Sequence, residues 1–308
     1  MKIAVIGAGA VGGYFGGRLA LAGHDVVFLV RGATLAALRA GPLRVKSLQG
    51  DFEVKVAATD DPSEIDAVEA VIVGVKAWQV AEAGAAIAKM RNRNSVVIPL
   101  QNGMEAPAKL AAVLGPGRAA GGLCWIVAKA IGPAHIDHFW AEPSIAFGEL
   151  EPLANHQVLE QLRDAFVAAG VRCDLSTDIA RAMWEKFLFI TPLGSLGAVT
   201  RLPVGPLCTD PEHRARLVAA LDEVAAIARA EGCDLGPREI AKTLAVLDGL
   251  RPDTTSSMQR DILAGRPSEL DAQTGAVVRF GRKTRVATPV HAAIYSQLLP
   301  LEENARRR

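Results

Sequence analysis

The first 31 residues constrain the fold more than any other part of the chain. Residues 2–6, KIAVI, are a continuous apolar run of strand length, and G-A-G-A-V-G follows at residues 7–12. Helical spacing then continues to Gly23, and VVFLV at residues 26–30 is a second pattern typical of a buried strand. This order predicts a strand, a glycine turn, a helix and a second strand, which together make a βαβ unit.

The glycine turn has the spacing of a dinucleotide-binding loop. Gly7 permits a tight turn, Gly9 lets the backbone approach a pyrophosphate, and Gly12 allows the helix to pack closely on the strand. The N–H groups and the positive dipole end of the helix then face the phosphates. We therefore predict that the whole loop binds a dinucleotide, through Gly7, Ala8, Gly9, Ala10, Val11 and Gly12.

The residue after the second strand favours one dinucleotide over the other. NAD-specific sites place an acidic residue here, whereas this chain has Arg31. A guanidinium suits a 2′-phosphate and offers no acceptor to a free 2′-hydroxyl. The sequence therefore predicts NADP(H) rather than NAD(H), although an exposed arginine after a strand can also be incidental.

Two more ligand candidates follow buried strands. Residues 67–76 and 95–103 each read as a parallel strand followed by a helix, while 43–56 read as two alternating strands. Ligands of open α/β sheets sit at the carboxyl ends of strands, where Lys76 and Asn102 are expected. Taken singly, Lys76 could simply start a helix and Asn102 could make an Asx turn.

The region 121–150 reads as further strands, broken at Gly132-Pro133 and Glu142-Pro143. It contains His135, Asp137 and His138, but on a strand the first two share one face and His138 points to the other. We therefore predict no metal site.

Composition narrows the class of protein. The chain has 308 residues, enough for two domains, and its 34 basic and 33 acidic side chains leave a net charge of +1. This balance argues against nucleic acid or an anionic membrane as a partner. The four cysteines form no C-x-x-C pair, and the chain has no signal peptide and no apolar run of about 18 residues, so we expect a cytoplasmic protein with reduced thiols.

Beyond Thr177 the pattern becomes helical almost throughout. We predict an α/β fold class, with an N-terminal Rossmann-like dinucleotide-binding domain at 1–177 and an all-helical C-terminal domain at 178–308. The first helix of the second domain is expected to end near Pro192, and the terminal ENARRR to be a frayed end. In several dehydrogenases of this architecture the substrate sits in the cleft between the domains.

One lysine of the helical half stands out. Residues 182–194, AMWEKFLFITPLG, set Lys186 among large apolar side chains. It is either a solvated charge on an amphipathic helix or a buried amine. Apolar neighbours would lower the pKa of the amine, which suits a proton donor to the alkoxide formed when a hydride reduces a ketone.

These motifs together resemble the ketopantoate reductases (2-dehydropantoate 2-reductases) over essentially the whole chain. The resemblance rests on KIAVIGAGAVGG, VKAWQ at 75–79, QNG at 101–103, W-E-K at 184–186, SSMQRD at 256–261 and ELD at 269–271. It implies NADPH-dependent reduction of 2-dehydropantoate to (R)-pantoate in pantothenate biosynthesis. It also implies a role for single residues, namely Lys186 as catalytic proton donor, Glu269 as a catalytic residue near the cofactor, Arg31 and Lys76 as cofactor contacts, Asn102 near nicotinamide and substrate, and Ser257 as a substrate contact.

Two departures from the family pattern leave the substrate open. The family expects asparagines four and eight residues after the lysine, where this chain has Ile190 and Gly194. We expect a larger and more apolar pocket on that wall. A bulkier 2-oxoacid, a catalytically inactive NADP(H)-sensing protein and another hydroxyacid dehydrogenase therefore remain alternatives. The expected partner is a small 2-oxoacid. A homodimer is a possible assembly, which the sequence leaves open.

Overall fold

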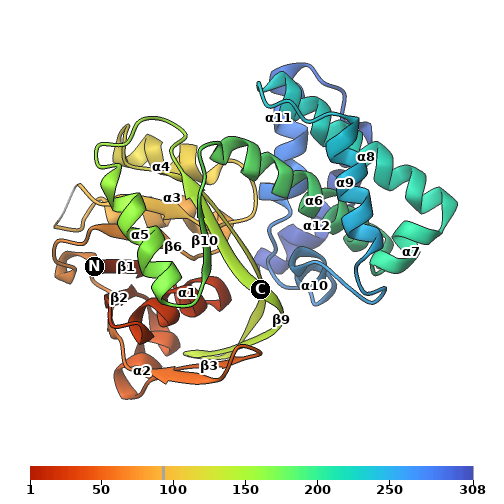
Figure 1. Cartoon of the computed structure of the whole chain (residues 1–308). Helices are drawn as coiled ribbons and strands as arrows, with labels where there is room; N and C mark the ends of the chain where they lie inside the picture. The colour runs from red at the N-terminus through yellow and green to blue at the C-terminus, as the bar shows by residue number, and fades with distance from the viewer. Residues whose placement is uncertain (92–93, 308) are drawn as a thin grey trace. The chain divides into compact units, whose positions relative to one another are not determined.

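The computed structural model describes residues 1–91 and 94–307. The chain divides into two compact units (Figure 1). The first contains Met1–Gln101 and Ala106–Ile179, and the second contains Asn102–Glu105 and Ala180–Arg308. The predicted fold class, a Rossmann-like unit and a helical unit, is confirmed. The four residues Asn102–Glu105 belong to the helical unit although strands of the first unit lie on both sides of them in the sequence.

A five-stranded parallel sheet forms the centre of the first unit. Its strand order is β5 (Ala57–Thr59), β2 (Asp25–Leu29), β1 (Lys2–Ile6), β6 (Ala70–Val73) and β7 (Val96–Pro99). Side chains of β1 alternate between two cores, as expected for a strand covered on both faces. Ile3 and Val5 pack with α1 (Ala10–Leu21), and Ala4 and Ile6 pack with α3 (Val80–Ile87) and α4 (Ala106–Leu114). Helix α2 (Gly32–Ala40) follows β2.

A second sheet of the same unit shares a core with α1. It contains β10 (Arg172–Leu175), β9 (His135–Gly148), β3 (Leu43–Ser47) and β4 (Phe52–Val54) in that order, and β8 (Gly121–Gly132) pairs with β9. Helix α5 (Gln157–Ala168) also packs in this core. Among the described residues, no group of three histidine, cysteine or acidic side chains is arranged to hold a metal ion.

The predicted break at Glu142-Pro143 is wrong, because β9 runs through it. The register between β8 and β9 shifts here, from Trp125 opposite Ser144 to Val127 opposite Trp140. Ala141 has a positive φ of 64° within this bulge. Proline has no N–H to donate, and a bulge is a place in a sheet where this loss is tolerated.

The second unit is helical. Its helices are α6 (Ile179–Thr200), α7 (Val204–Thr209), α8 (Pro211–Ala230), α9 (Pro237–Asp248), α10 (Ser257–Leu263), α11 (Ala276–Thr284) and α12 (Pro289–Arg307), with a π-helical turn at Asp271–Gly275 before α11. Of the helices in the part of the chain that the structure describes, none is long and apolar enough to cross a membrane.

Two predictions about helix ends are wrong. Helix α6 continues past Pro192 to Thr200. An internal proline costs about 3 kcal/mol, but Leu188 and Leu196, on either side of it, are fully buried in the core, and each contributes about 1.5–3 kcal/mol. Residues 303–307 of the C-terminal ENARRR are also helical rather than frayed, because Ala305 is buried and Arg306 forms an ion pair of 2.7 Å with Glu302. Arg308 lies outside the described residues.

Candidate active site

The carboxyl ends of four neighbouring strands carry Gln101 and the predicted ligand residues of the first unit. In sheet order, Arg31 follows β2, Gly7 follows β1, Lys76 follows β6 and Gln101 follows β7. This edge is where open α/β sheets bind ligands. The strand order thus brings Gly7 and Gln101, which are 94 positions apart in the sequence, to the same edge of the sheet.

The glycine loop has the local geometry of a phosphate site. Gly7 has a φ of +89°, and a Cβ at Gly12 would lie 2.1 Å from the Gly7 carbonyl oxygen, so the helix start approaches the strand end at backbone distance. Among the described residues, a Cβ at Gly9 would meet no heavy atom within 4 Å. Gly9 is the N-cap of α1 and supplies no side-chain hydrogen bond, which leaves the first helical N–H groups available to an anion. The loop therefore fits a dinucleotide pyrophosphate.

Arg31 lies where the 2′-phosphate interpretation expects it, but it has a partner. Its Nη1 donates to Glu82 Oε1 over 2.7 Å, and its Nη2 lies 3.4 Å from Glu82 Oε2. Both side chains are largely exposed, at 70% and 60%. An exposed ion pair of this kind contributes about 0–1 kcal/mol, so the guanidinium can exchange Glu82 for a phosphate at small cost.

Lys76 and Gln101 occupy the next two strand ends. Lys76 is exposed, and its Nζ lies 5.8 Å from the centre of the Trp78 ring. Gln101 is buried, and its Nε2 donates to the carbonyl oxygens of Val73 and Val75, both over 2.8 Å. Gln101 therefore fixes the backbone that leads from β6 to Lys76, which the sequence analysis did not anticipate.

Lys186 is buried in the second unit. Its side chain is 6% exposed and lies on α6, three residues from Met183 and next to Phe187, both buried. Trp184 stacks edge-on against Phe187 at 5.7 Å and against Phe280 of α11 at 5.6 Å between ring centres. The interpretation of Lys186 as a solvated helix charge is therefore excluded for this structure.

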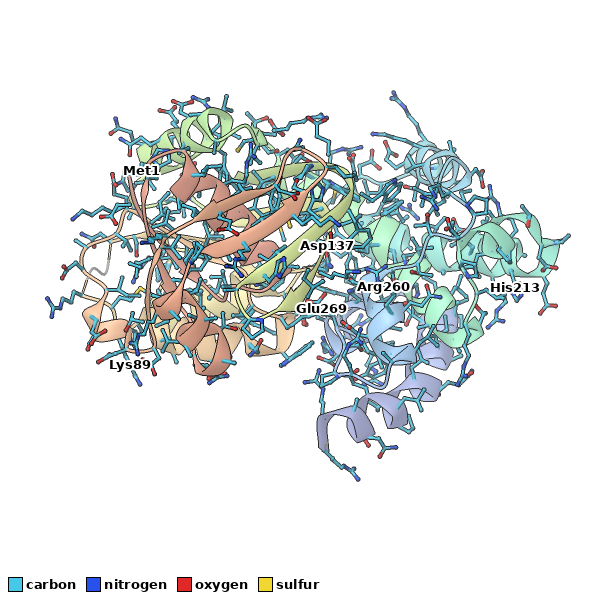
Figure 2. The ribbon with its side chains drawn as sticks, turned by 90° about the horizontal axis from the view of Figure 1, so that it is seen from below. Met1, Lys89, Asp137, His213, Arg260 and Glu269 are labelled. Carbon is cyan, nitrogen blue, oxygen red and sulfur yellow. The ribbon has the colours of Figure 1, made fainter. Side chains whose placement is uncertain are left out.

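Asn102 and Glu269 are brought together, although 167 residues separate them. Asn102 Nδ2 donates to Glu269 Oε2 over 3.3 Å, and Glu269, labelled in Figure 2, is 7% exposed. Gln273 Nε2 lies 3.5 Å from the same carboxylate oxygen. The buried carboxylate thus faces two amide groups, which can compensate part of the cost of its burial.

A charged cluster holds this segment in the second unit. Arg279 donates to both carboxylate oxygens of Glu105, over 3.0 and 2.8 Å, and to Asp271 over 2.7 Å. Burial alone lowers the pKa of Arg279, but its hydrogen bonds with the two carboxylates outweigh that effect and raise it. Tyr295 donates to Asp271, and burial together with this bond raises the pKa of Tyr295 to about 12. The segment Asn102–Glu105 is thereby fixed next to Glu269.

Ser257 is the first residue of α10 and is half-buried. Ser256 is the N-cap, and its Oγ accepts the Gln259 N–H over 3.0 Å. The structure brings Ser256 close to Gly194, since a Cβ on that glycine would lie 3.2 Å from Ser256 Oγ. The same Cβ would lie 3.0 Å from Met258 Cε and 3.5 Å from Gln273 Oε1.

These contacts correct one expectation about the substrate pocket. The space beside Gly194 is occupied by the side chains of Ser256, Met258 and Gln273, two of which are polar, so the glycine leaves no empty room there. Ile190 is half-buried, which agrees with an apolar group at the other departing position. Sequence reasoning missed Gln273, although its position four residues after Glu269 would place both on one side of a helical turn.

Comparisons with known proteins agree with this arrangement. The family model described as "Ketopantoate reductase PanE/ApbA" matches residues 3–152, and the one described as "Ketopantoate reductase PanE/ApbA C terminal" matches residues 178–302. A 2-dehydropantoate 2-reductase of Nostoc is 28% identical over 310 residues, which cover 99% of this chain and 96% of that protein.

Solved structures have the same fold. A PanE/ApbA family ketopantoate reductase from Ralstonia eutropha has a TM-score of 0.89 and 30% identity, with 99% of this chain and 100% of that chain covered. A D-mandelate dehydrogenase with NADH and anilino(oxo)acetate has a TM-score of 0.89 at 23% identity, covering 99% of each chain, and shares the fold. The resemblance seen in the sequence is confirmed, and the chain belongs to the ketopantoate reductase family of oxidoreductases that act on CH–OH groups.

Proposed function

We propose that this protein reduces the ketone of 2-dehydropantoate to (R)-pantoate with NADPH, as a step of pantothenate biosynthesis. The observation that carries the proposal is the burial of Lys186, at 6% exposure, in the same unit as the Asn102–Glu269 pair. Burial of an ammonium group is costly, and proton transfer to a reacting oxygen is a function that would retain it.

The residues of the first unit fit the cofactor. NADPH supplies the hydride that the carbonyl carbon accepts. The open space at Gly9 and the free N–H groups at the start of α1 suit its pyrophosphate. Arg31 suits its 2′-phosphate, because a guanidinium binds phosphate through paired hydrogen bonds. Lys76, at the neighbouring strand end, adds a positive charge at the same edge.

Lys186 performs the proton transfer in this proposal. The carbonyl carbon accepts the hydride, the carbonyl oxygen gains a negative charge, and the Lys186 ammonium donates one proton to that oxygen. The product is an alcohol, and the neutral amine regains its proton from solvent. Asn102, Ser257 and Glu269 orient the substrate and the cofactor through hydrogen bonds, so that the reacting atoms meet in one geometry.

A second candidate is the reduction of a bulkier 2-oxoacid by the same residues. Ile190 favours it, because it is apolar where the family pattern expects an amide. A protein of the same fold, a D-mandelate dehydrogenase, has been solved with NADH and anilino(oxo)acetate. This second candidate function includes the use of NADH in place of NADPH. A catalytically inactive NADP(H)-sensing protein is the third.

The decisive experiment follows NADPH and NADH oxidation with a panel of 2-oxoacids, including 2-dehydropantoate and phenyl-2-oxoacetate. We expect the highest kcat/KM with NADPH and 2-dehydropantoate. A higher value with the aromatic acid would favour the second candidate. An absence of turnover with every acid, while NADPH binding by calorimetry remains intact, would refute both reductase proposals and leave the sensing protein.

A further inference from the structure

The buried side chain of Glu302 in α12 binds the residue that precedes Glu269. Glu302 is 3% exposed, and both of its carboxylate oxygens lie 3.0 Å from the Ser268 backbone nitrogen. One of these oxygens also accepts the Ser268 hydroxyl. Arg306, one turn further along α12, pairs with Glu302 and donates to the Ser268 carbonyl oxygen over 3.2 Å. The N–H, the carbonyl and the hydroxyl of Ser268 are therefore all bonded to side chains of α12.

This anchoring continues on the other side of Glu269. The Ser268 Oγ accepts the Leu270 N–H over 3.2 Å, and both residues are fully buried. The hydroxyl that the α12 carboxylate binds thus connects the backbone before Glu269 to the backbone after it. Tyr295, also on α12, donates to Asp271 over 2.9 Å. Helix α12 therefore holds the segment that carries Glu269 at two points.

The carboxylate of Glu269 depends on this backbone for its position. Asn102 Nδ2 donates to it over 3.3 Å, and Gln273 Nε2 lies 3.5 Å from the same oxygen. Both distances are longer than the usual N–H···O separation of about 2.9 Å. A small shift of the Glu269 backbone would therefore break both contacts.

The carboxylate of Glu302 is buried, and burial of a charge is costly unless hydrogen bonds and an opposite charge compensate it. Here Ser268 and Arg306 supply both. Resting on the proposed function, we propose that Glu302 is a positioning residue for the reaction, because by binding Ser268 it fixes the Glu269 carboxylate opposite Asn102. The alternative is a carboxylate that stabilises the fold and has no specific effect on Glu269.

A double-mutant cycle separates these two roles. Glu302→Ala should lower kcat/KM for 2-dehydropantoate with NADPH about 10- to 100-fold, the loss expected when a group in the site is displaced by about 1 Å. In Glu269→Ala, which lacks the carboxylate that Glu302 positions, the same substitution should change kcat/KM less than about twofold. The decrease in Tm should be equal in both backgrounds, because Ser268 loses the same hydrogen bonds in each.

Glu223→Gln is the matched control for Glu302→Gln. Glu223 of α8 is also buried, and its carboxylate accepts the N–H groups of Val290 and His291 at the other end of α12. Both variants should lower Tm, but Glu223→Gln should keep kcat/KM within about twofold of the unmodified protein. If Glu302→Ala does not fold, Ser268→Ala takes its place in the cycle, since it removes the hydroxyl and keeps the N–H.

Crystal structures without substrate test the positioning directly. We expect Glu269 to move out of hydrogen-bond distance of Asn102 in Glu302→Ala and to stay within it in Glu223→Gln. An unmoved Glu269, or an equal fold-loss of kcat/KM in the two backgrounds of the cycle, would overturn the inference. A displaced Glu269, together with no reduction of any 2-oxoacid by the unmodified protein, would overturn the proposed function and leave the positioning role of Glu302 in place.

Discussion

Replacing Gly9 by alanine separates the nucleotide-binding role of the glycine loop from its role in folding. Gly9 has φ −72° and ψ −168°, which alanine adopts without strain, and an added Cβ meets no heavy atom of residues 1–91 and 94–307 within 4 Å. The loss of chain entropy in the unfolded state stabilises the variant by about 0.4–1 kcal/mol. Alanine is a poorer N-cap than glycine by an amount of about the same size. The two effects offset each other, so Tm should stay within about 4 °C.

Cofactor affinity should respond differently. The methyl group occupies the open side of the loop, where a pyrophosphate approaches the backbone. We expect NADPH affinity to fall at least about tenfold, equivalent to about 1.4 kcal/mol. Calorimetric titration gives the affinity, and differential scanning calorimetry of the protein without cofactor gives Tm.

Gly12→Ala is the matched control. Its Cβ would lie 2.1 Å from the Gly7 carbonyl oxygen, which forces the backbone apart. Such a shift costs about 1–3 kcal/mol, or a decrease in Tm of roughly 2–12 °C. The reasoning fails if Gly9→Ala binds NADPH as tightly as the unmodified protein, or if it lowers Tm as much as Gly12→Ala.

Three further predictions concern single side chains. Glu82→Gln frees Arg31 from an exposed ion pair, so NADPH should bind up to about fivefold tighter. The affinity for NADH, titrated in parallel, should not rise. An equal gain for both cofactors would contradict the 2′-phosphate role of Arg31. Arg279→Lys removes the paired hydrogen bonds with Glu105 and should lower the free energy of unfolding, measured in urea, by about 1 kcal/mol. Adding Glu105→Gln to this variant should lower it little further. Fully additive losses of stability would argue against the interaction of Arg279 with Glu105. Burial raises the pKa of Cys173 to about 12. Near pH 8 its reaction with iodoacetamide should therefore be roughly a thousandfold slower than that of a free cysteine. Rapid labelling of Cys173, detected by mass spectrometry, would refute this.

Local signals made the first unit predictable. The apolar runs of β1 and β2, the glycines between them and the stop at Gly23 act over short distances in the sequence, and the structure has the strands and the helix where these signals indicate. Lys76 and Arg31 could be assigned to one edge because parallel strands fix the direction of their ends.

The candidate site of the second unit depends on contacts that local patterns do not report. Pro192 indicates a helix end, but burial of the neighbouring leucines outweighs it. The π-helical turn at Asp271–Gly275 and the pairing of Asn102 with Glu269 are set by tertiary packing. The surroundings of Gly194 were mispredicted for the same reason, since a glycine in a sequence does not reveal which distant side chains fill the space beside it.

The most direct test of the account compares the unmodified protein with Lys186→Ala in a single turnover. NADPH oxidation is followed after mixing with 2-dehydropantoate, and NADPH affinity is measured on the same samples by fluorescence titration. We expect a rate loss of at least about 100-fold with nearly unchanged NADPH affinity. A variant that oxidises NADPH at the rate of the unmodified protein would contradict the assignment of Lys186 as the proton donor.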